Sequence, residues 1–181
     1  MNAEDLRPFR QAAPDYYQTE QLKGDLRRLR SKRAPFYLTR DELERIFYWK
    51  LGNQYNRVAE RLEQNTESGY KAITTAALSI IEDDADYEVQ LRLGVLMSLS
   101  GVGIGVASAI LALCDPDKYC VIDFRGWRTA FFPDECHNFG LDTYLRYLHE
   151  VKRLTNALNW TPMGSEARLE PTGSRPCPVG L

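Results

Sequence analysis

Apolar residues in this chain recur mainly at the spacing of an α-helix. The clearest cases are 87–99 and 141–158, where apolar side chains return every three or four positions, and 16–33 is rich in helix formers. This spacing places apolar side chains on one helix face, whereas a half-buried strand would alternate every second residue. We find no internal repeat and no convincing pair of strands. The pattern predicts an all-α fold of about eight helices.

Local signals set several helix boundaries. Pro35 ends the first helix, and Thr39 with Glu42 three positions later is a capping box that starts the next. That helix is expected to stop at Gly52, because glycine readily leaves the helical conformation. Further helices are expected over 55–62, 70–81, 106–113 and from Asp123 onward, with a turn at 115–117 and an extended segment at 119–122.

Length and composition favour a single domain. The chain has 181 residues, of which 44% are hydrophobic and 27% charged, which is enough to bury one core. Helical periodicity continues to about residue 160, and Pro, Gly and Ser prevail beyond it. We therefore expect one compact domain over 1–160 and a flexible C-terminal tail over 161–181.

Charge and cysteine spacing argue against several kinds of protein. The formal net charge is −2, so a nucleic-acid surface would have to be local rather than spread over the molecule. The four cysteines include no Cys-x-x-Cys pair, which argues against a zinc or iron–sulfur site. No apolar run is long enough to cross a bilayer, and the start of the chain does not look like a secretion signal. We expect a cytoplasmic monomer that binds no metal and no membrane.

The most informative segment is a glycine-rich turn between two apolar helical stretches. Closely spaced glycines let the backbone turn sharply with its amides exposed, and amides at a helix N-terminus bind phosphate without a basic side chain. A tight packing turn between helices has the same composition, so the glycines by themselves leave both interpretations open. The residues expected to contact a nucleic-acid backbone are Gly101, Val102, Gly103, Ile104 and Gly105.

From this turn onward the chain resembles the helix-hairpin-helix superfamily of DNA glycosylases, which includes endonuclease III and the adenine glycosylases. The match runs from Leu99 through a helix of small residues to Val121, Ile122 and Asp123, roughly a sixth of the chain. The distance from Gly101 to Asp123 is also the one expected in that family. The resemblance implies a compact helix-hairpin-helix domain that binds duplex DNA through the hairpin backbone.

The resemblance also assigns a role to Asp123. In these glycosylases the aspartate stabilises positive charge on the sugar as the base leaves, and it helps to position or deprotonate the attacking water. The physics is general, because a nearby carboxylate favours an oxocarbenium-like transition state. An aspartate here is also expected to cap the next helix through the amides of Arg125 or Gly126. Arg125 and Arg128 either contact phosphates or form an ordinary surface pair.

Two departures from the family pattern limit the expected chemistry. Bifunctional members carry a nucleophilic lysine at the position that is Gly105 here, and some members bind an iron–sulfur cluster through four cysteines that this chain lacks. The resemblance therefore implies a glycosylase without lyase activity. It implies no cofactor, apart from the monovalent cation that hairpin carbonyls hold in relatives.

A glycosylase must extrude its target base into a pocket, commonly lined by aromatic and polar residues. The candidates cluster at the end of one helix and in the loop after it, although core packing is the simpler explanation for each aromatic residue taken alone. They are Tyr48, Trp49, Lys50, Gln54 and Tyr55.

The sequence thus predicts a monofunctional DNA N-glycosylase, a hydrolase of base-excision DNA repair. Two alternatives stay open. The first is a non-catalytic helix-hairpin-helix module that binds DNA, which the negative net charge favours. The second is a helical protein-interaction domain that binds no nucleic acid.

Overall fold

The computed structural model describes residues 16–131, 136, 138–157 and 160–163. Within these residues it contains eight α-helices and one 3-10 helix, with no β-strand. The all-α prediction is confirmed. In chain order the helices are α2 (Tyr16–Lys32), α3 (Arg40–Leu51), η1 (Gly52–Arg57), α4 (Ala59–Glu63), α5 (Glu67–Ser79), α6 (Ala85–Leu96), α7 (Ile104–Cys114), α8 (Phe124–Phe131) and α9 (Leu141–Ala157).

Helix α3 begins and ends where the sequence predicted. The Thr39 side chain accepts a hydrogen bond from the Glu42 N–H, and the Glu42 carboxylate accepts one from the Thr39 N–H at 2.9 Å. These reciprocal bonds satisfy amides that have no partner within the helix. At the other end Gly52 has a φ of 50°, which favours glycine. This end point matters because Lys50 lies in the last turn.

Several other boundaries differ from the prediction, two of them because of local hydrogen bonds. The single helix expected over 55–62 is instead the 3-10 helix η1 followed by α4. Helices α5 and α6 begin earlier than expected, because the side chains of Thr66 and Asp84 accept hydrogen bonds from the first-turn amides. Helix α6 also stops at Leu96, so the connection 97–103 begins before the glycines.

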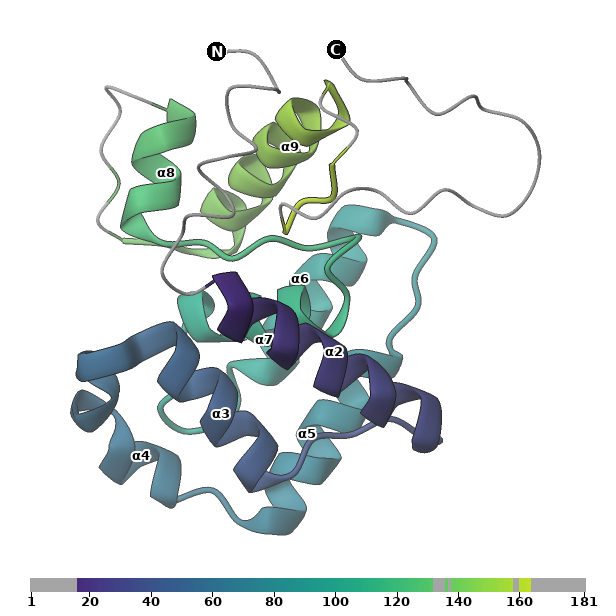
Figure 1. Cartoon of the computed structure of the whole chain (residues 1–181), viewed down its shortest axis with the longest axis vertical. Helices are drawn as coiled ribbons and strands as arrows, with labels where there is room; N and C mark the ends of the chain where they lie inside the picture. Colours follow the sequence, from purple (N-terminus) through teal and green to yellow (C-terminus); the bar gives the residue numbers. More distant parts are fainter. Residues whose placement is uncertain (1–15, 132–135, 137, 158–159, 164–181) are drawn as a thin grey trace.

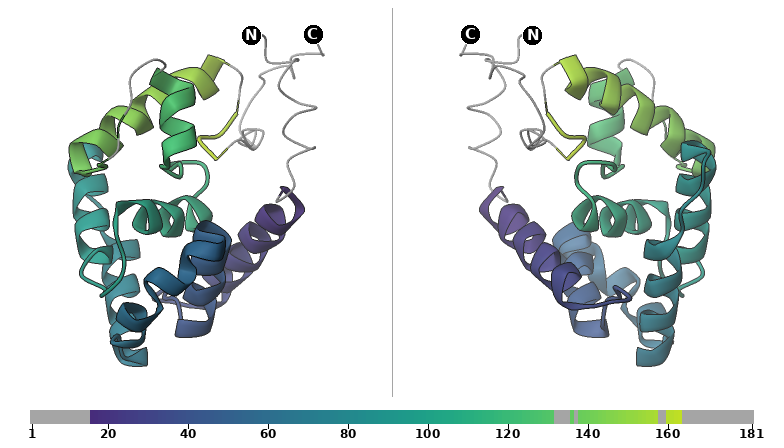
Figure 2. Two further views of the ribbon diagram at one scale, coloured as in Figure 1. Left: turned by 90° about the vertical axis from the view of Figure 1, so that its left-hand side faces the viewer. Right: turned by 90° about the vertical axis from the view of Figure 1, so that its right-hand side faces the viewer.

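Helix α7 is the centre of the molecule. Every residue from Val106 to Cys114 is buried, as expected of a helix that is apolar all round. In both views of Figure 2, α7 lies between the pair formed by α8 and α9 and the group that contains α2 and α3, with α5 and α6 along one side (Figures 1 and 2). Helices α2, α3 and α6 all pack against it. Because α7 also carries the glycine-rich turn at its N-terminus, that turn is anchored to the core.

The extended segment before α8 is tied to α7 by a buried serine. The Ser108 hydroxyl donates to the carbonyl oxygen of Gly105 at 2.9 Å and accepts from the N–H of Ile122 at 3.2 Å. The side chain of Ile122 is fully buried. Asp123, the next residue, is therefore held close to the first turn of α7.

An aromatic cluster joins α8 to α9. Buried Trp127 packs against Phe131, Phe139 and Tyr147, with ring centroids 4.3, 5.9 and 6.4 Å away. Of the predicted C-terminal tail only 161–163 is described. There Thr161 is buried and the N–H of Met163 donates to the Pro116 carbonyl at 3.4 Å.

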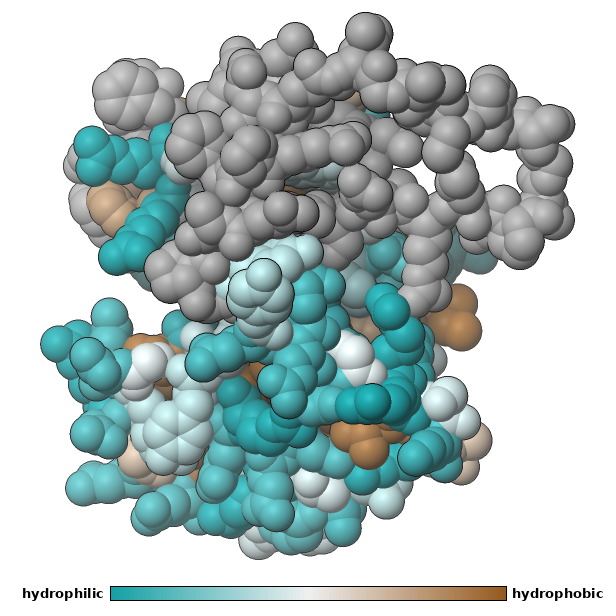
Figure 3. Space-filling view, in the orientation of Figure 1, coloured by the Kyte–Doolittle hydropathy of each residue, from teal (hydrophilic) through white to brown (hydrophobic). Residues whose placement is uncertain are grey.

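The surface over α2 and α3 is mainly hydrophilic, with only small apolar patches on the coloured part of the face in Figure 3. Among the described residues, no helix combines the length and the apolar character that a membrane span requires. The polar surface agrees with a core concentrated around α7.

Candidate active site

Two side chains from distant parts of the chain meet beside the first turn of α7. The Lys50 Nζ atom, at the end of α3, donates to the carbonyl oxygen of Ile122 at 3.1 Å and lies 3.3 Å from the Oδ2 atom of Asp123. The Lys50 side chain is only 11% exposed, whereas that of Asp123 is 50% exposed. The result is a largely buried lysine side chain next to a carboxylate that solvent or a ligand can reach.

Asp123 also caps α8, as the sequence predicted. Its Oδ1 atom accepts a hydrogen bond from the N–H of Gly126 at 2.8 Å, and its carbonyl oxygen accepts one from the N–H of Trp127 at 2.9 Å. Capping therefore uses one carboxylate oxygen and leaves the other facing Lys50. The structural role of Asp123 does not exclude a chemical one.

The surroundings keep the Asp123 carboxyl group ionised. Burial by itself would raise its pKa, but the Gly126 N–H and the positive charge of Lys50 outweigh that effect, so the pKa is lowered. The pKa of Lys50 is also lowered, because burial disfavours its charged form more than Asp123 stabilises it. The pair thus combines a stable anion with an amine that loses its proton more readily than an ordinary lysine does.

Asp123 borders two cavities that share four lining residues, namely Trp49, Lys50, Asp123 and Arg125. One, of about 380 Å³, is lined by Trp49, Lys50, Asp123 and Tyr147 among others. The second, of about 550 Å³, is lined by the first three of these residues together with Gln54 and Arg125. Both lie in the usual size range of small-molecule sites.

The glycine-rich turn is held in place by one carboxamide. The Asn65 side chain donates to the carbonyl oxygen of Ser100 and accepts from the N–H of the same residue, both at 2.9 Å. Gly101 next to it has a φ of 83°, and a Cβ there would lie 3.1 Å from Leu62. The positive φ therefore favours glycine at 101, and a Cβ there would also crowd the side chain of Leu62.

Gly103 behaves differently from Gly101. Its φ is −99° and its ψ 178°, an extended conformation open to any residue, and a Cβ there would meet nothing within 4 Å. The residue of this turn that adopts a positive φ is thus Gly101 and not Gly103. The first hydrogen bond of α7 runs from the N–H of Val106 to Gly103, so the preceding amides of Ile104 and Gly105 have no helical partner.

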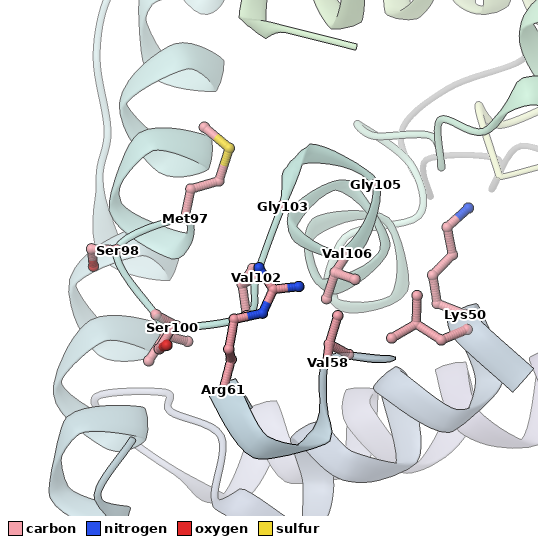
Figure 4. A pocket seen from close by; sticks show the side chains of 13 residues that line it. Lys50, Val58, Arg61, Met97, Ser98, Ser100, Val102, Gly103, Gly105 and Val106 are labelled. Carbon is pink, nitrogen blue, oxygen red and sulfur yellow. The ribbon is translucent and has the colours of Figure 1, made fainter. Parts of the chain in front are cut away.

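A third cavity, of about 610 Å³, connects the turn to Lys50. Its walls include residues 97–103, Gly105 and Val106 of α7, Lys50 of α3 and Arg61 of α4. Figure 4 shows Arg61 reaching from α4 toward Val102, while Lys50 extends beside Gly105. Lys50 therefore borders all three cavities, so that the turn and the Asp123 carboxylate belong to one continuous surface.

The structure brings together some of the predicted site residues and separates others. Trp49, Lys50, Gln54 and Arg125 line cavities with Asp123, whereas Tyr48 and Tyr55 stack on each other with ring centroids 4.0 Å apart. Tyr48 is 56% exposed and borders a separate pocket against α2. Arg128 is exposed and lines none of the described cavities. In the turn, Val102 is buried, Ile104 and Gly105 are partly buried, and Gly103 is exposed.

Two residues of this surface were not predicted from the sequence. Arg61 lies against the turn, its Cβ atom 3.2 Å from the position of a Cβ at Gly101, and it forms no ion pair within the described part of the chain. Tyr147 is buried, and a side chain at residue 126 would collide with its hydroxyl group. The apolar spacing of 141–158 placed Tyr147 in no functional role, and no local signal singles out Arg61.

The buried cysteines are structural. Cys114 and Cys120 are buried free thiols, and burial raises the pKa of each to about 12, so neither is a reactive thiolate. Cys177 lies outside the described residues. Within those residues no group of three or more His, Cys, Asp or Glu side chains is arranged to hold a metal ion.

The features that bear most directly on function therefore lie together. They are the Lys50–Asp123 pair, the cavities around it and the adjoining turn. Comparison of the chain with protein-family models, with curated proteins and with solved structures gives no match.

Proposed function

We propose that this protein is a DNA N-glycosylase that hydrolyses the bond between a modified or mismatched base and its sugar. The observation that carries the proposal is the Asp123 carboxylate, which is ionised, half exposed and next to two cavities. As the base leaves, positive charge develops on the sugar, and a fixed carboxylate stabilises that charge most where water is partly excluded.

Binding of DNA is supported by the adjoining turn. The free amides at the N-terminus of α7 suit a phosphate group, and helix dipoles add partial positive charge there. Arg61 adds a full positive charge on the same side of the turn. These local features suit a backbone contact in a protein whose net charge is −2. No cofactor enters the proposed reaction.

Water is the proposed nucleophile for base removal. Residue 105 is glycine and carries no amine, and the half-exposed Asp123 carboxylate is able to orient a water molecule at the cavity. The bound base is proposed to occupy the space between Trp49, Gln54 and Arg125, where one aromatic and two polar side chains converge.

The test is a panel of DNA duplexes, each with one lesion or modified base. After incubation with the protein, alkali reveals abasic sites as strand breaks on a denaturing gel. Breaks in one or a few duplexes, and none in the unmodified duplex, are the expected result. Binding of the panel without any break would instead support the non-catalytic DNA-binding module. That alternative is favoured by one observation, namely that the helix cap and Lys50 already engage both oxygens of Asp123.

A further inference from the structure

The Lys50 side chain is largely buried and borders cavities of ligand size. Its side chain is 11% exposed, whereas that of Lys71, an ordinary surface lysine, is 42% exposed. Its ammonium contacts the Ile122 carbonyl and Asp123, and its side chain borders three cavities. Surface lysines keep their amines in water, so this placement needs a reason beyond solubility.

Gly105 lies beside Lys50 at an ordinary contact distance. A Cβ at that position would lie 3.8 Å from Lys50 Cε and 3.6 Å from the Ile122 carbonyl oxygen. The lysine from α3 therefore runs alongside the first turn of α7 and places its amine beside Asp123. Helix α7 supplies no amine to this site, and the neighbouring helix α3 supplies that of Lys50.

We propose that Lys50 is an imine-forming amine whose ligands are aldehydes, in particular the ring-opened sugar of an abasic site. The identity of that sugar rests on the proposed function, whereas the reactivity of the amine does not. Lysines that act in this way are typically desolvated, because only the neutral amine is a nucleophile. The lowered pKa of Lys50, caused by burial, meets that requirement.

The reaction needs no cofactor and no oxidant. The Lys50 ammonium gives one proton to Asp123 or to water, and the nitrogen lone pair forms a bond to the aldehyde carbon. The carbonyl oxygen then takes the two remaining amine protons and leaves as water, while a C=N bond forms. Base removal by water thus produces the aldehyde that Lys50 captures. This departs from the expectation that Gly105 leaves the site without an amine.

The test uses the full-length protein and a duplex with one abasic site made beforehand by uracil removal, so that base removal by this protein is not required. Borohydride reduces an imine to a stable secondary amine, which appears as a protein–DNA adduct on a denaturing gel. Free deoxyribose phosphate serves as a second aldehyde probe that needs no DNA binding. Peptide mapping by mass spectrometry then identifies the modified residue, with Lys50 expected for both probes.

Three variants complete the experiment. Lys50→Arg keeps a cation next to Asp123 but cannot form the imine, and Lys50→Gln removes the charge as well; both should lose the adduct. Lys118→Gln changes an exposed lysine and should keep it. An adduct at another amine, an undiminished adduct in folded Lys50→Arg, or no adduct with either probe would overturn the proposal. A protein that traps the aldehyde on Lys50 but removes no base from the lesion panel would refute only the proposed glycosylase.

Discussion

Changing Asp123 to asparagine separates its structural role from its chemical one. The carbonyl oxygen of the new carboxamide would still accept the Gly126 N–H, so the cap of α8 is kept. The other carboxylate oxygen is replaced by an amide nitrogen, which donates hydrogen bonds and carries no charge. Lys50 therefore loses its ion-pair partner but retains its bond to the Ile122 carbonyl.

The two expected effects of this change differ greatly in size. Because the Asp123 side chain is 50% exposed, losing the ion pair should cost about 1 kcal/mol of unfolding free energy, or about 2–4 °C in Tm for a chain of this size. Losing the charge that stabilises a cationic sugar should cost about 3–4 kcal/mol in the transition state, roughly two to three orders of magnitude in rate. A total stability of about 5–15 kcal/mol absorbs the first cost without unfolding.

The assay is single-turnover base removal from a duplex that the wild type processes, with thermal unfolding followed by circular dichroism. Asp117→Asn is the matched control, because Asp117 is an exposed aspartate in the turn before the site; its rate should equal that of the wild type. DNA binding by the Asp123→Asn variant should be unchanged or tighter, since a carboxylate near phosphates repels them. A folded Asp123→Asn protein that removes the base at the wild-type rate would refute the role given to Asp123.

Four further changes test the turn and the fold. Gly103→Val should keep the wild-type Tm, because a Cβ at residue 103 meets open space, yet it should weaken binding to all duplexes in a fluorescence titration. Gly101→Val should instead lower the Tm, because the φ of residue 101 is 83°. Arg61→Gln should reduce the slope of log affinity against log salt by about 0.9, the value for one phosphate contact, and an unchanged slope would remove Arg61 from the interface. Burial raises the pKa of Glu42, but its hydrogen bonds, above all from Arg33, outweigh that effect and lower it. The charge of Glu42 therefore adds stability above its unfolded pKa of about 4.5, and this stability is lost as pH falls through the lower folded value. In urea titrations Glu42→Gln should cost about 1 kcal/mol near pH 7 and almost nothing near pH 2; an equal cost at both would contradict the reasoning.

Features that depend on neighbouring residues were predictable from the sequence. The capping box at Thr39 and the break at Gly52 involve residues a few positions apart, and the structure has both. The prediction of a single helix over 55–62 was wrong, because periodicity does not distinguish a 3-10 helix from an α-helix over so few residues. Thr66 and Asp84 are good helix caps, and their hydrogen bonds explain the early starts of α5 and α6.

Only part of the candidate site could be predicted from the sequence. Asp123 stands out because it follows an extended segment and precedes a helix. That Lys50 contacts it could not be inferred, because the two residues are far apart in sequence and meet only through the packing of α3 on α7. Arg61 is likewise brought to the turn by tertiary packing, through Leu62 and the Asn65 carboxamide.

The Asn65 carboxamide has a consequence for the thermodynamics of binding. By pairing with both the N–H and the carbonyl of Ser100, it acts toward the turn as a neighbouring β-strand would. A turn fixed in this way is preorganised, so a ligand that binds its amides does not have to pay for ordering the backbone. The entropic cost of binding would then fall mainly on the long side chains around the turn, such as Arg61. Affinity at this surface should therefore depend on Asn65, although Asn65 binds the turn and not the ligand.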